Sequence, residues 1–215
     1  MRRVHPIEVE SMRILRDLVD LSRFGPLSRA VAERVIHASA DLEYAESLVL
    51  DEGALENGLR ALRRGEPIIA DVGMAAAGIT ARETRCFVSD PRAKRLSEDL
   101  GTTRSAAGFR LAAMEVGSGA AWVVGNAPTA LFELLDLAVE PALVVGLPVG
   151  FVGAAESKEK LLESGLPAIT NRGPKGGSAV RHRRQPAADQ ALLRLRCPHE
   201  PDREPDDERG LDVHL

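Results

Sequence analysis

The first part of the chain carries apolar residues at helical spacing. Between residues 6 and 21, one helical face holds Ile7, Ile14, Leu15 and Leu18. Gly25-Pro26 interrupts this pattern, and a second helix is predicted through Leu27, Val31 and Val35, ending near His37. A third helix is predicted over residues 53–64, before Gly65. We therefore expect a helical N-terminal segment.

The pattern then changes to short apolar runs that alternate with further helical stretches. The runs are at 67–71, 86–88, 121–124, 142–145 and 167–170. The helical stretches are at 91–100, 105–116, 127–139 and 154–164. Strands that alternate with helices are typical of parallel sheets. The sequence predicts an α/β fold with a mainly parallel central sheet of about five strands, flanked by helices.

This architecture predicts where a site would lie. Open α/β sheets bind ligands beyond the carboxyl ends of their strands. The residues expected there are Asp71, Ser89, Asp90, Gly125, Asn126, Pro148, Gly150, Asn171 and Arg172. Some of them must be simple turn formers, because Gly, Pro, Asn and Asp favour turns in any case.

The end of the chain does not follow the pattern. Residues 181–215 are rich in Arg, Pro, Asp and Glu, and apolar periodicity largely disappears. Such composition favours disorder. We interpret residues 1–180 as one α/β domain and residues 181–215 as an atypical tail. Hydrophobic content of 44% with only 3% aromatic residues predicts a core built mainly of aliphatic side chains.

Charge and cysteine usage narrow the functional classes. A net charge of −4 argues against a general nucleic-acid binder. Cys86 and Cys197 lie far apart without metal-type spacing, so neither a disulfide framework nor a zinc site is expected. The N-terminus lacks a signal-peptide pattern, and no stretch is apolar enough to span a membrane. A cytoplasmic protein without a metal is the simplest interpretation.

Two glycine-rich segments follow predicted strands. Residues 146–153 lack the G-x-G-x-x-G spacing, and residues 173–178 lack the Gly-Lys-Ser order of a phosphate loop. Tight strand-to-helix turns explain both better than nucleotide binding does. Their N–H groups could also hold ligand carboxylates at helix N-termini.

A few side chains are candidates for chemistry, and each has a plainer interpretation. His37 can exchange a proton near neutral pH, but a histidine at a helix end is more often a cap. Arg104, at a predicted helix start, is either a surface residue or a bidentate clamp on a carboxylate. Arg172 and Lys175 leave the same two alternatives, and Ser11 would ordinarily be a surface hydroxyl.

Four segments together change this balance. They read Ile-His-Ala at 36–38, Thr-Arg-Ser-Ala-Ala at 103–107, GNAPTALF at 125–132 and PVGFVGAAESK at 148–158. In order and spacing the chain resembles the precorrin-8X methylmutase family of corrin (vitamin B12) biosynthesis. The resemblance extends from Pro6 through Val180, where the family pattern continues with a helix that this chain replaces.

The resemblance implies an isomerase that moves one methyl group on a corrin-type tetrapyrrole, turning precorrin-8X into hydrogenobyrinate, with no cofactor of its own. It implies that His37 is the catalytic proton donor and acceptor, and that Ser11 and Arg104 bind substrate. It also implies a homodimer, with Ser11 reaching the site across the interface. The alanine- and glycine-rich segments 74–78 and 106–108 are expected to form an apolar floor. The alternative is a hydrogenobyrinate carrier without substantial turnover.

Overall fold

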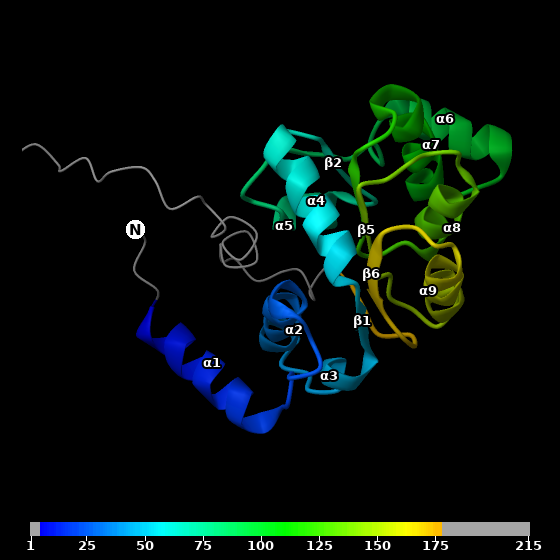
Figure 1. Ribbon diagram of the computed structural model, residues 1–215. Helices are drawn as coiled ribbons and strands as arrows, with labels where there is room; N and C mark the ends of the chain where they lie inside the picture. Colours follow the sequence, from blue (N-terminus) through cyan, green and yellow to red (C-terminus); the bar gives the residue numbers. More distant parts are fainter. Residues whose placement is uncertain (1–4, 178–215) are drawn as a thin grey trace, which may run out of the picture.

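The computed structural model describes residues 5–177, and its centre is a six-stranded sheet (Figure 1). The strand order is β1-β6-β5-β4-β2-β3. The bounds are β1 Leu48–Leu50, β2 Ile68–Ala70, β3 Thr84–Arg85, β4 Ala121–Val124, β5 Leu143–Gly146 and β6 Ala168–Asn171. The predicted tail at 181–215 and Cys197 lie outside the described residues.

All neighbouring strands except one pair are parallel. β2 pairs with β3 and β4, β4 with β5, and β5 with β6, all in parallel. β1 lies at the edge and runs antiparallel to β6, with Leu48 opposite Asn171. The carboxyl ends of the five parallel strands therefore share one edge of the sheet, and the chain enters β1 at that same edge.

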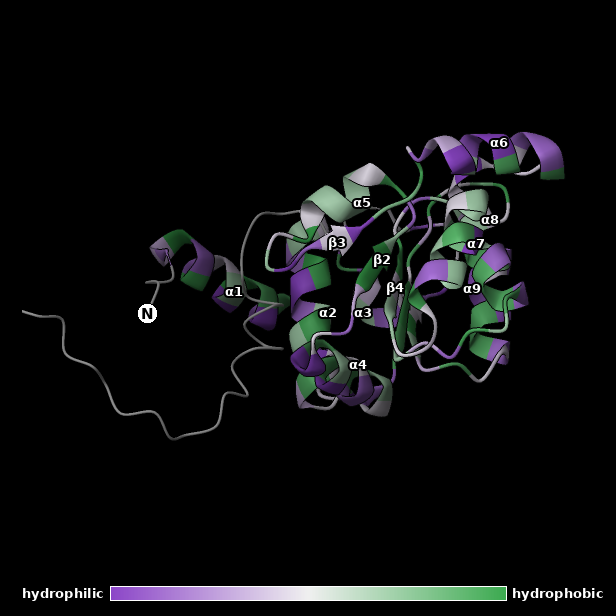
Figure 2. Cartoon of the chain, turned by 90° about the horizontal axis from the view of Figure 1, so that it is seen from above, coloured by the Kyte–Doolittle hydropathy of each residue, from purple (hydrophilic) through white to green (hydrophobic). Residues whose placement is uncertain are grey.

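Helices cover both faces of the sheet (Figures 1 and 2). One side carries the N-terminal helices and α4–α5, and the other carries α6–α9. The first group comprises α1 Pro6–Leu18, α2 Pro26–Ser39, α3 Tyr44–Ser47, α4 Glu52–Arg64 and α5 Gly73–Gly78. The second comprises α6 Pro91–Leu100, α7 Arg104–Val116, α8 Pro128–Asp136 and α9 Ala154–Glu163. The mainly parallel α/β architecture and the helical N-terminal segment are thus as expected.

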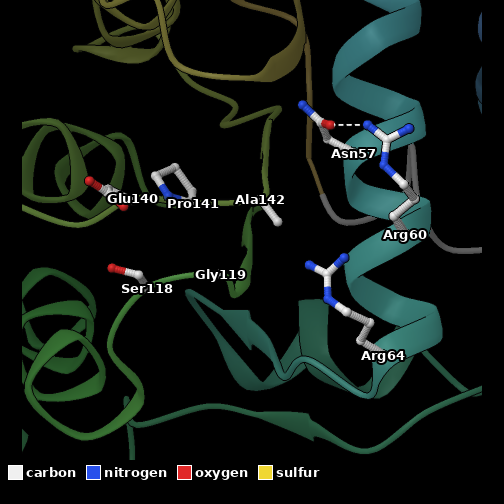
Figure 3. Close-up of a pocket in the computed structure, with 8 residues that line it drawn as sticks. All are labelled: Asn57, Arg60, Arg64, Ser118, Gly119, Glu140, Pro141 and Ala142. Atoms are coloured by element: carbon white, nitrogen blue, oxygen red, sulfur yellow. Dashed lines mark hydrogen bonds between the residues drawn. The ribbon is translucent and has the colours of Figure 1, made fainter.

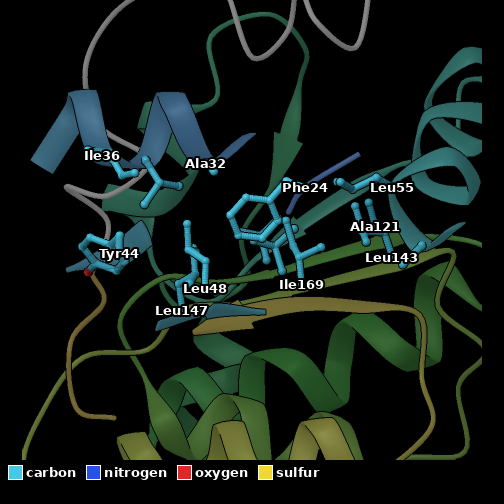
Figure 4. Packing of buried hydrophobic residues seen from close by; sticks show 14 of the residues in the cluster. Phe24, Ala32, Ile36, Tyr44, Leu48, Leu55, Ala121, Leu143, Leu147 and Ile169 are labelled. Carbon is cyan, nitrogen blue, oxygen red and sulfur yellow. The ribbon is translucent and has the colours of Figure 1, made fainter. Parts of the chain in front are cut away.

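Strand alternation divides the core into two clusters. Along β4, Ala121 and Val123 pack beneath α2 and α4, whereas Trp122 and Val124 pack beneath α7–α9. Figure 4 shows the first cluster. In the second cluster, the rings of Phe109 and Trp122 meet edge to face with centroids 5.0 Å apart. Both faces of the sheet are therefore buried, as parallel sheets require.

The helix that carries His37 begins at an anchored N-terminus. Gly25 offers no capping side chain to α2, and Glu52 of α4 takes over that role. Its carboxylate accepts from the backbone N–H of Leu27 and Ser28 and from the Ser28 hydroxyl. Burial raises the pKa of Glu52, but these hydrogen bonds outweigh it and hold the pKa below its usual value. The position of α2 is thereby fixed against α4.

Helix α1 projects from the rest of the chain and lies against α2 (Figure 1). Two ion pairs join the helices, Arg16–Glu33 and Arg34–Glu8. Leu15 is the buried residue of α1, but the other members of its predicted apolar face are exposed: Ile7 is 74%, Ile14 45% and Leu18 60% exposed. An apolar helix face thus remains uncovered in the single chain.

The structure corrects several predicted elements. Residues 86–88 are not a strand, and the shorter Thr84–Arg85 forms β3 instead. The sheet has six strands rather than about five, because Leu48–Leu50 adds an antiparallel edge. The first helix ends at Leu18 instead of Leu21. Across residues 5–177, no helix has the length and apolar character that a membrane span requires.

Candidate active site

The structure brings His37 and Ser11 together. The Ser11 hydroxyl lies 3.0 Å from Nδ1 of His37, and both residues are half-buried. Ser11 comes from the middle of α1, and His37 from the last turn of α2. The packing of α1 on α2 thus joins two residues that are 26 positions apart. Here the contact is made within one chain.

This pair is suited to proton exchange. A serine hydroxyl is both a donor and an acceptor, and neutral imidazole carries its proton on either nitrogen. In the acid form of His37, the imidazolium, both ring nitrogens carry a proton, so Nδ1 donates to the Ser11 oxygen and Nε2 can give its proton away. In the neutral form that results, Nδ1 keeps its proton and still donates to Ser11, and Nε2 becomes an acceptor. The same contact therefore serves both the acid and the base form of His37.

Helix capping is carried out by a neighbour of His37. Ser39 donates its hydroxyl proton to the carbonyl oxygens of Val35 and Ile36, and Ala40 ends the helix with a left-handed φ of 54°. Nδ1 of His37 contacts Ser11.

Arg104 lies at the start of α7, at the carboxyl edge of the sheet. Thr103 caps this helix by accepting from the N–H of Ala106, and its hydroxyl also lies 2.8 Å from the Thr129 hydroxyl at the start of α8. Arg104 is exposed, and no carboxylate within residues 5–177 forms an ion pair with it. Its planar guanidinium is available to a ligand carboxylate.

Asp71 organises the loop between β4 and α8. This side chain, only 1% exposed, follows β2 and accepts three backbone N–H groups, from Gly125 at 3.1 Å, Asn126 at 2.8 Å and Ala127 at 2.7 Å. Sequence reasoning placed Asp71 at this edge but did not assign it a role. Because its carboxylate accepts from three N–H groups of this loop, Asp71 ties the residues that precede α8 to the end of β2.

Apolar side chains are exposed at the same edge. Phe151 is 99% exposed, Val152 88% and Val149 41%, all in the segment between β5 and α9. Met74, after β2, is 59% exposed. Exposed apolar groups that gather at the mouth of an α/β sheet are typical of a binding surface.

The expected apolar floor is only half present. Ala106, Ala107 and Gly108 are buried inside the chain, and Gly108 allows α7 to approach the backbone of Phe87 and Val88. They are packing residues. Met74 belongs to α5, a short helix that sequence analysis missed and that is exposed in part.

The two cationic residues that follow β6, Arg172 and Lys175, both form ion pairs within the chain. Arg172 forms an ion pair with Glu159 at 2.8 Å. The Lys175 ammonium lies 2.6 Å from both Asp41 and Glu43, in the loop that follows α2, and these contacts raise its pKa. A cavity of about 400 Å³ lies between that loop and residues 172–175. These pairs favour a structural role for Arg172 and Lys175.

Lys158 is a residue that sequence reasoning did not single out. It lies on α9 and is fully buried. Its ammonium donates to Oδ1 of Asn171 at 3.2 Å and to the carbonyl of Lys175 at 2.6 Å. Its spacing from Ala154 and Leu161 marks the inward face of the helix, so the sequence did contain a signal.

A second cavity, of about 370 Å³, lies at the opposite edge of the sheet. Figure 3 shows Arg64 of α4 reaching toward the turns that precede β4 and β5, whereas Arg60 is hydrogen-bonded to Asn57 on the same helix. Both arginines contact neighbouring carboxylates, Glu56 and Glu66. This edge lies away from the carboxyl ends, where α/β sheets place their sites. Within residues 5–177, no group of three His, Cys, Asp or Glu side chains is arranged to hold a metal ion.

Comparison with known proteins gives the family. The model of the precorrin-8X methylmutase family matches residues 6–183. The chain belongs to this family. A cobalt-precorrin-8 methylmutase from Salmonella typhimurium is 44% identical over 186 residues, covering 81% of this chain and 89% of the relative. One from Methanothermobacter thermautotrophicus is 40% identical over 197 residues, covering 89% and 93%.

A solved structure agrees in fold. The crystal structure of a precorrin-8x methyl mutase from Thermus thermophilus matches with a TM-score of 0.76 and 37% identity, covering 88% of this chain and 94% of that one. The family is one of isomerases that act in cobalamin biosynthesis. The family resemblance read from the four sequence segments is therefore confirmed.

Proposed function

We propose that the chain catalyses the methyl transfer that converts precorrin-8X, or its cobalt-containing counterpart, into the hydrogenobyrinate form. The observation that carries this proposal is the Ser11–His37 pair in a chain of the precorrin-8X methylmutase family. The reaction is an isomerisation, so every atom of the substrate is kept in the product. The enzyme therefore needs only to supply and recover a proton.

His37 is the proton donor and acceptor in this proposal. Its Nε2 gives a proton to the conjugated ring, which changes the electronic state of the macrocycle and lowers the barrier to methyl migration. The same nitrogen takes a proton back after the shift, so His37 is regenerated. Ser11 supports both states through Nδ1. A positioned general acid contributes about 10²–10⁴-fold to a rate.

Arg104 and the carboxyl edge bind the substrate. A corrin-type ring carries carboxylate arms around a flat, largely apolar centre. The Arg104 guanidinium suits a carboxylate, and the N-termini of α7 and α8 add a favourable dipole. The exposed Phe151, Val152 and Met74 can cover the apolar faces of the ring. The features at this edge match the two kinds of surface that the substrate presents.

Turnover assays test the proposal. Purified protein is mixed with precorrin-8X or with its cobalt-containing counterpart, and the change in absorption of the macrocycle is followed. We expect His37→Ala to lower kcat by about 10²–10⁴-fold. His5→Ser is the matched control, because His5 is exposed and serine keeps a capping acceptor at the start of α1. Normal turnover by folded His37→Ala would refute the mechanism. Tight hydrogenobyrinate binding without turnover by the parent would favour the carrier function instead.

We also propose a homodimer in which α1 contributes to the interface. The exposed Ile7, Ile14 and Leu18 form an apolar face that a second copy can cover. Replacing Ile14 and Leu18 with Glu should shift the protein to monomers in sedimentation velocity. A parent protein that is monomeric at micromolar concentration would contradict this proposal.

Mixed dimers show which chain supplies Ser11. The structure has the Ser11–His37 contact within one chain, whereas the family resemblance implies a contact across the interface. Ser11→Ala and His37→Ala proteins are unfolded together and refolded. If Ser11 acts across the interface, mixed dimers hold one intact site and recover about a quarter of the parent activity. If it acts within the chain, as in the structure, activity does not recover.

A further inference from the structure

Lys158 combines complete burial with the absence of an ion pair. The side chain is 0% exposed, and within residues 5–177 no carboxylate lies within salt-bridge distance of it. Both of its acceptors are uncharged, a carbonyl and an amide oxygen. Desolvation lowers its pKa to about 8. Burying an ammonium without an ion pair carries a large desolvation cost.

Lys158 binds the segment that follows β6, at Lys175. This segment contacts both the loop after α2 and the segment between β5 and α9. The carbonyl of Lys175 accepts from Lys158 and from Nδ2 of Asn171 at 2.9 Å, while its ammonium binds Asp41 and Glu43. Asp41 lies four residues after His37. Residue 175 is therefore fixed at its backbone by the sheet and α9, and at its side chain by the loop that ends α2.

The same segment also supports the apolar wall of the site. The N–H of Gly150 donates to the carbonyl of Pro174 at 3.2 Å, and the N–H of Gly177 donates to the carbonyl of Leu147 at 2.8 Å. Gly176 has no side chain, and a Cβ there would collide with the Leu147 and Pro148 carbonyls. Residues 174–177 thus lie backbone to backbone against the segment that carries Val149, Phe151 and Val152.

We propose that Lys158 is a positioning residue that sets the distance between His37 and the wall at residues 147–152 by holding residue 175 between them. The inference rests on the proposed function, because it assigns both walls to one substrate site. Lys158 does not touch substrate in this arrangement. It acts through the Lys175 carbonyl and, by way of the Lys175 ammonium, through Asp41.

Substitution of Lys158 and Lys175 by Met separates the contacts of the Lys175 carbonyl from those of the Lys175 ammonium. Lys158→Met keeps an unbranched apolar stem but removes both donated hydrogen bonds, so we expect a fall in kcat and a rise in KM, with kcat/KM at least about tenfold lower. Lys175→Met leaves its carbonyl bound and releases only Asp41 and Glu43, so kcat should fall with KM within about twofold. The kcat losses should not add in the double variant, because both act through residue 175.

The control is Lys160→Met, an exposed lysine on the same helix that pairs with Asp136. A merely structural Lys158 would lower the thermal midpoint and leave the kcat and KM of the folded enzyme unchanged. That result, or full activity of Lys158→Met, overturns the proposal. If Lys158→Met does not fold, Lys175→Met decides, since normal kcat in that variant also overturns it. An inactive parent enzyme would refute the proposed function instead.

Discussion

Asp71 provides a direct test of how the site edge is built. Its carboxylate accepts three backbone N–H groups of the β4–α8 loop, with Oδ1 serving Gly125 and Oδ2 serving Asn126 and Ala127. Asn in its place can keep its single oxygen toward two of these donors. Its amide group then faces the third N–H, so one hydrogen bond is lost and two lose the assistance of the charge.

The magnitude follows from these three contacts. A hydrogen bond to a charged group contributes about 1.5–3 kcal/mol, and a stranded buried donor costs about 1–3 kcal/mol. Asp71→Asn should therefore reduce the free energy of unfolding by about 3 kcal/mol, and Asp71→Ala by about 5 kcal/mol or more. Such a loss is a large part of the stability of an ordinary domain, which is about 5–15 kcal/mol.

Urea unfolding followed by tryptophan fluorescence measures this loss. The chain contains one tryptophan, Trp122, and it is fully buried in β4 next to the affected loop. Asp136→Asn is the matched control, because Asp136 is exposed and its one ion pair within residues 5–177 is with Lys160. This substitution should change stability by less than about 0.5 kcal/mol. An Asp71→Asn protein within about 1 kcal/mol of the parent would show that the loop is held by other contacts.

Three further changes test other parts of the structure. Gly58→Ala should destabilise the protein by about 1–3 kcal/mol in the same urea assay, because the added Cβ would lie 2.6 Å from Cδ2 of Leu143; an unchanged midpoint would contradict this close packing of α4 on β5. Glu52 has a lowered pKa in the folded state, so its stabilisation is present above its usual pKa of 4.5 and is lost as pH falls through the folded value. Glu52→Gln should therefore lose less stability than the parent between pH 6 and about pH 3, and equal losses would argue against this role. Arg104→Met should weaken hydrogenobyrinate binding about tenfold with little change in thermal stability, and unaltered affinity in a binding titration would exclude the carboxylate contact.

Local signals made much of the fold predictable. Helix α6 is bounded by Asp90 and Pro91 at its start and Gly101 at its end, and its predicted bounds of 91–100 agree with the structure. The run at 121–124 is β4, buried on both faces. The run at 86–88 was misassigned because its apolar residues pack against Gly108 without pairing to a strand. β1 has only three residues, and its pairing with β6 is set by tertiary structure.

The site was less accessible to pattern reasoning. His37 and Ser11 lie on separate helices, and only the packing of α1 on α2 brings them together. Periodicity favoured a cap for His37, and it was the family resemblance that gave it a role. The roles of Ser11 and Arg104 stay predictions until the assays above are done. The roles of Asp71 and Lys158 needed the structure. Asp71 binds three backbone N–H groups, and Lys158 binds a backbone carbonyl and the amide of Asn171, all of which lie far away in the sequence.

The antiparallel edge strand has a consequence for the order of folding. Leu48 can find its partner Asn171 only after almost the whole described chain has been made, 123 positions later by the two residue numbers. Contacts so distant in sequence form late, because the loop between them must first be closed. During synthesis, β1, which follows the N-terminal helices, can therefore join the sheet only after the last strand, β6, has emerged from the ribosome. A ribosome stalled before β6 should carry a chain in which α2, the helix of His37, has been synthesised but β1 has no partner strand.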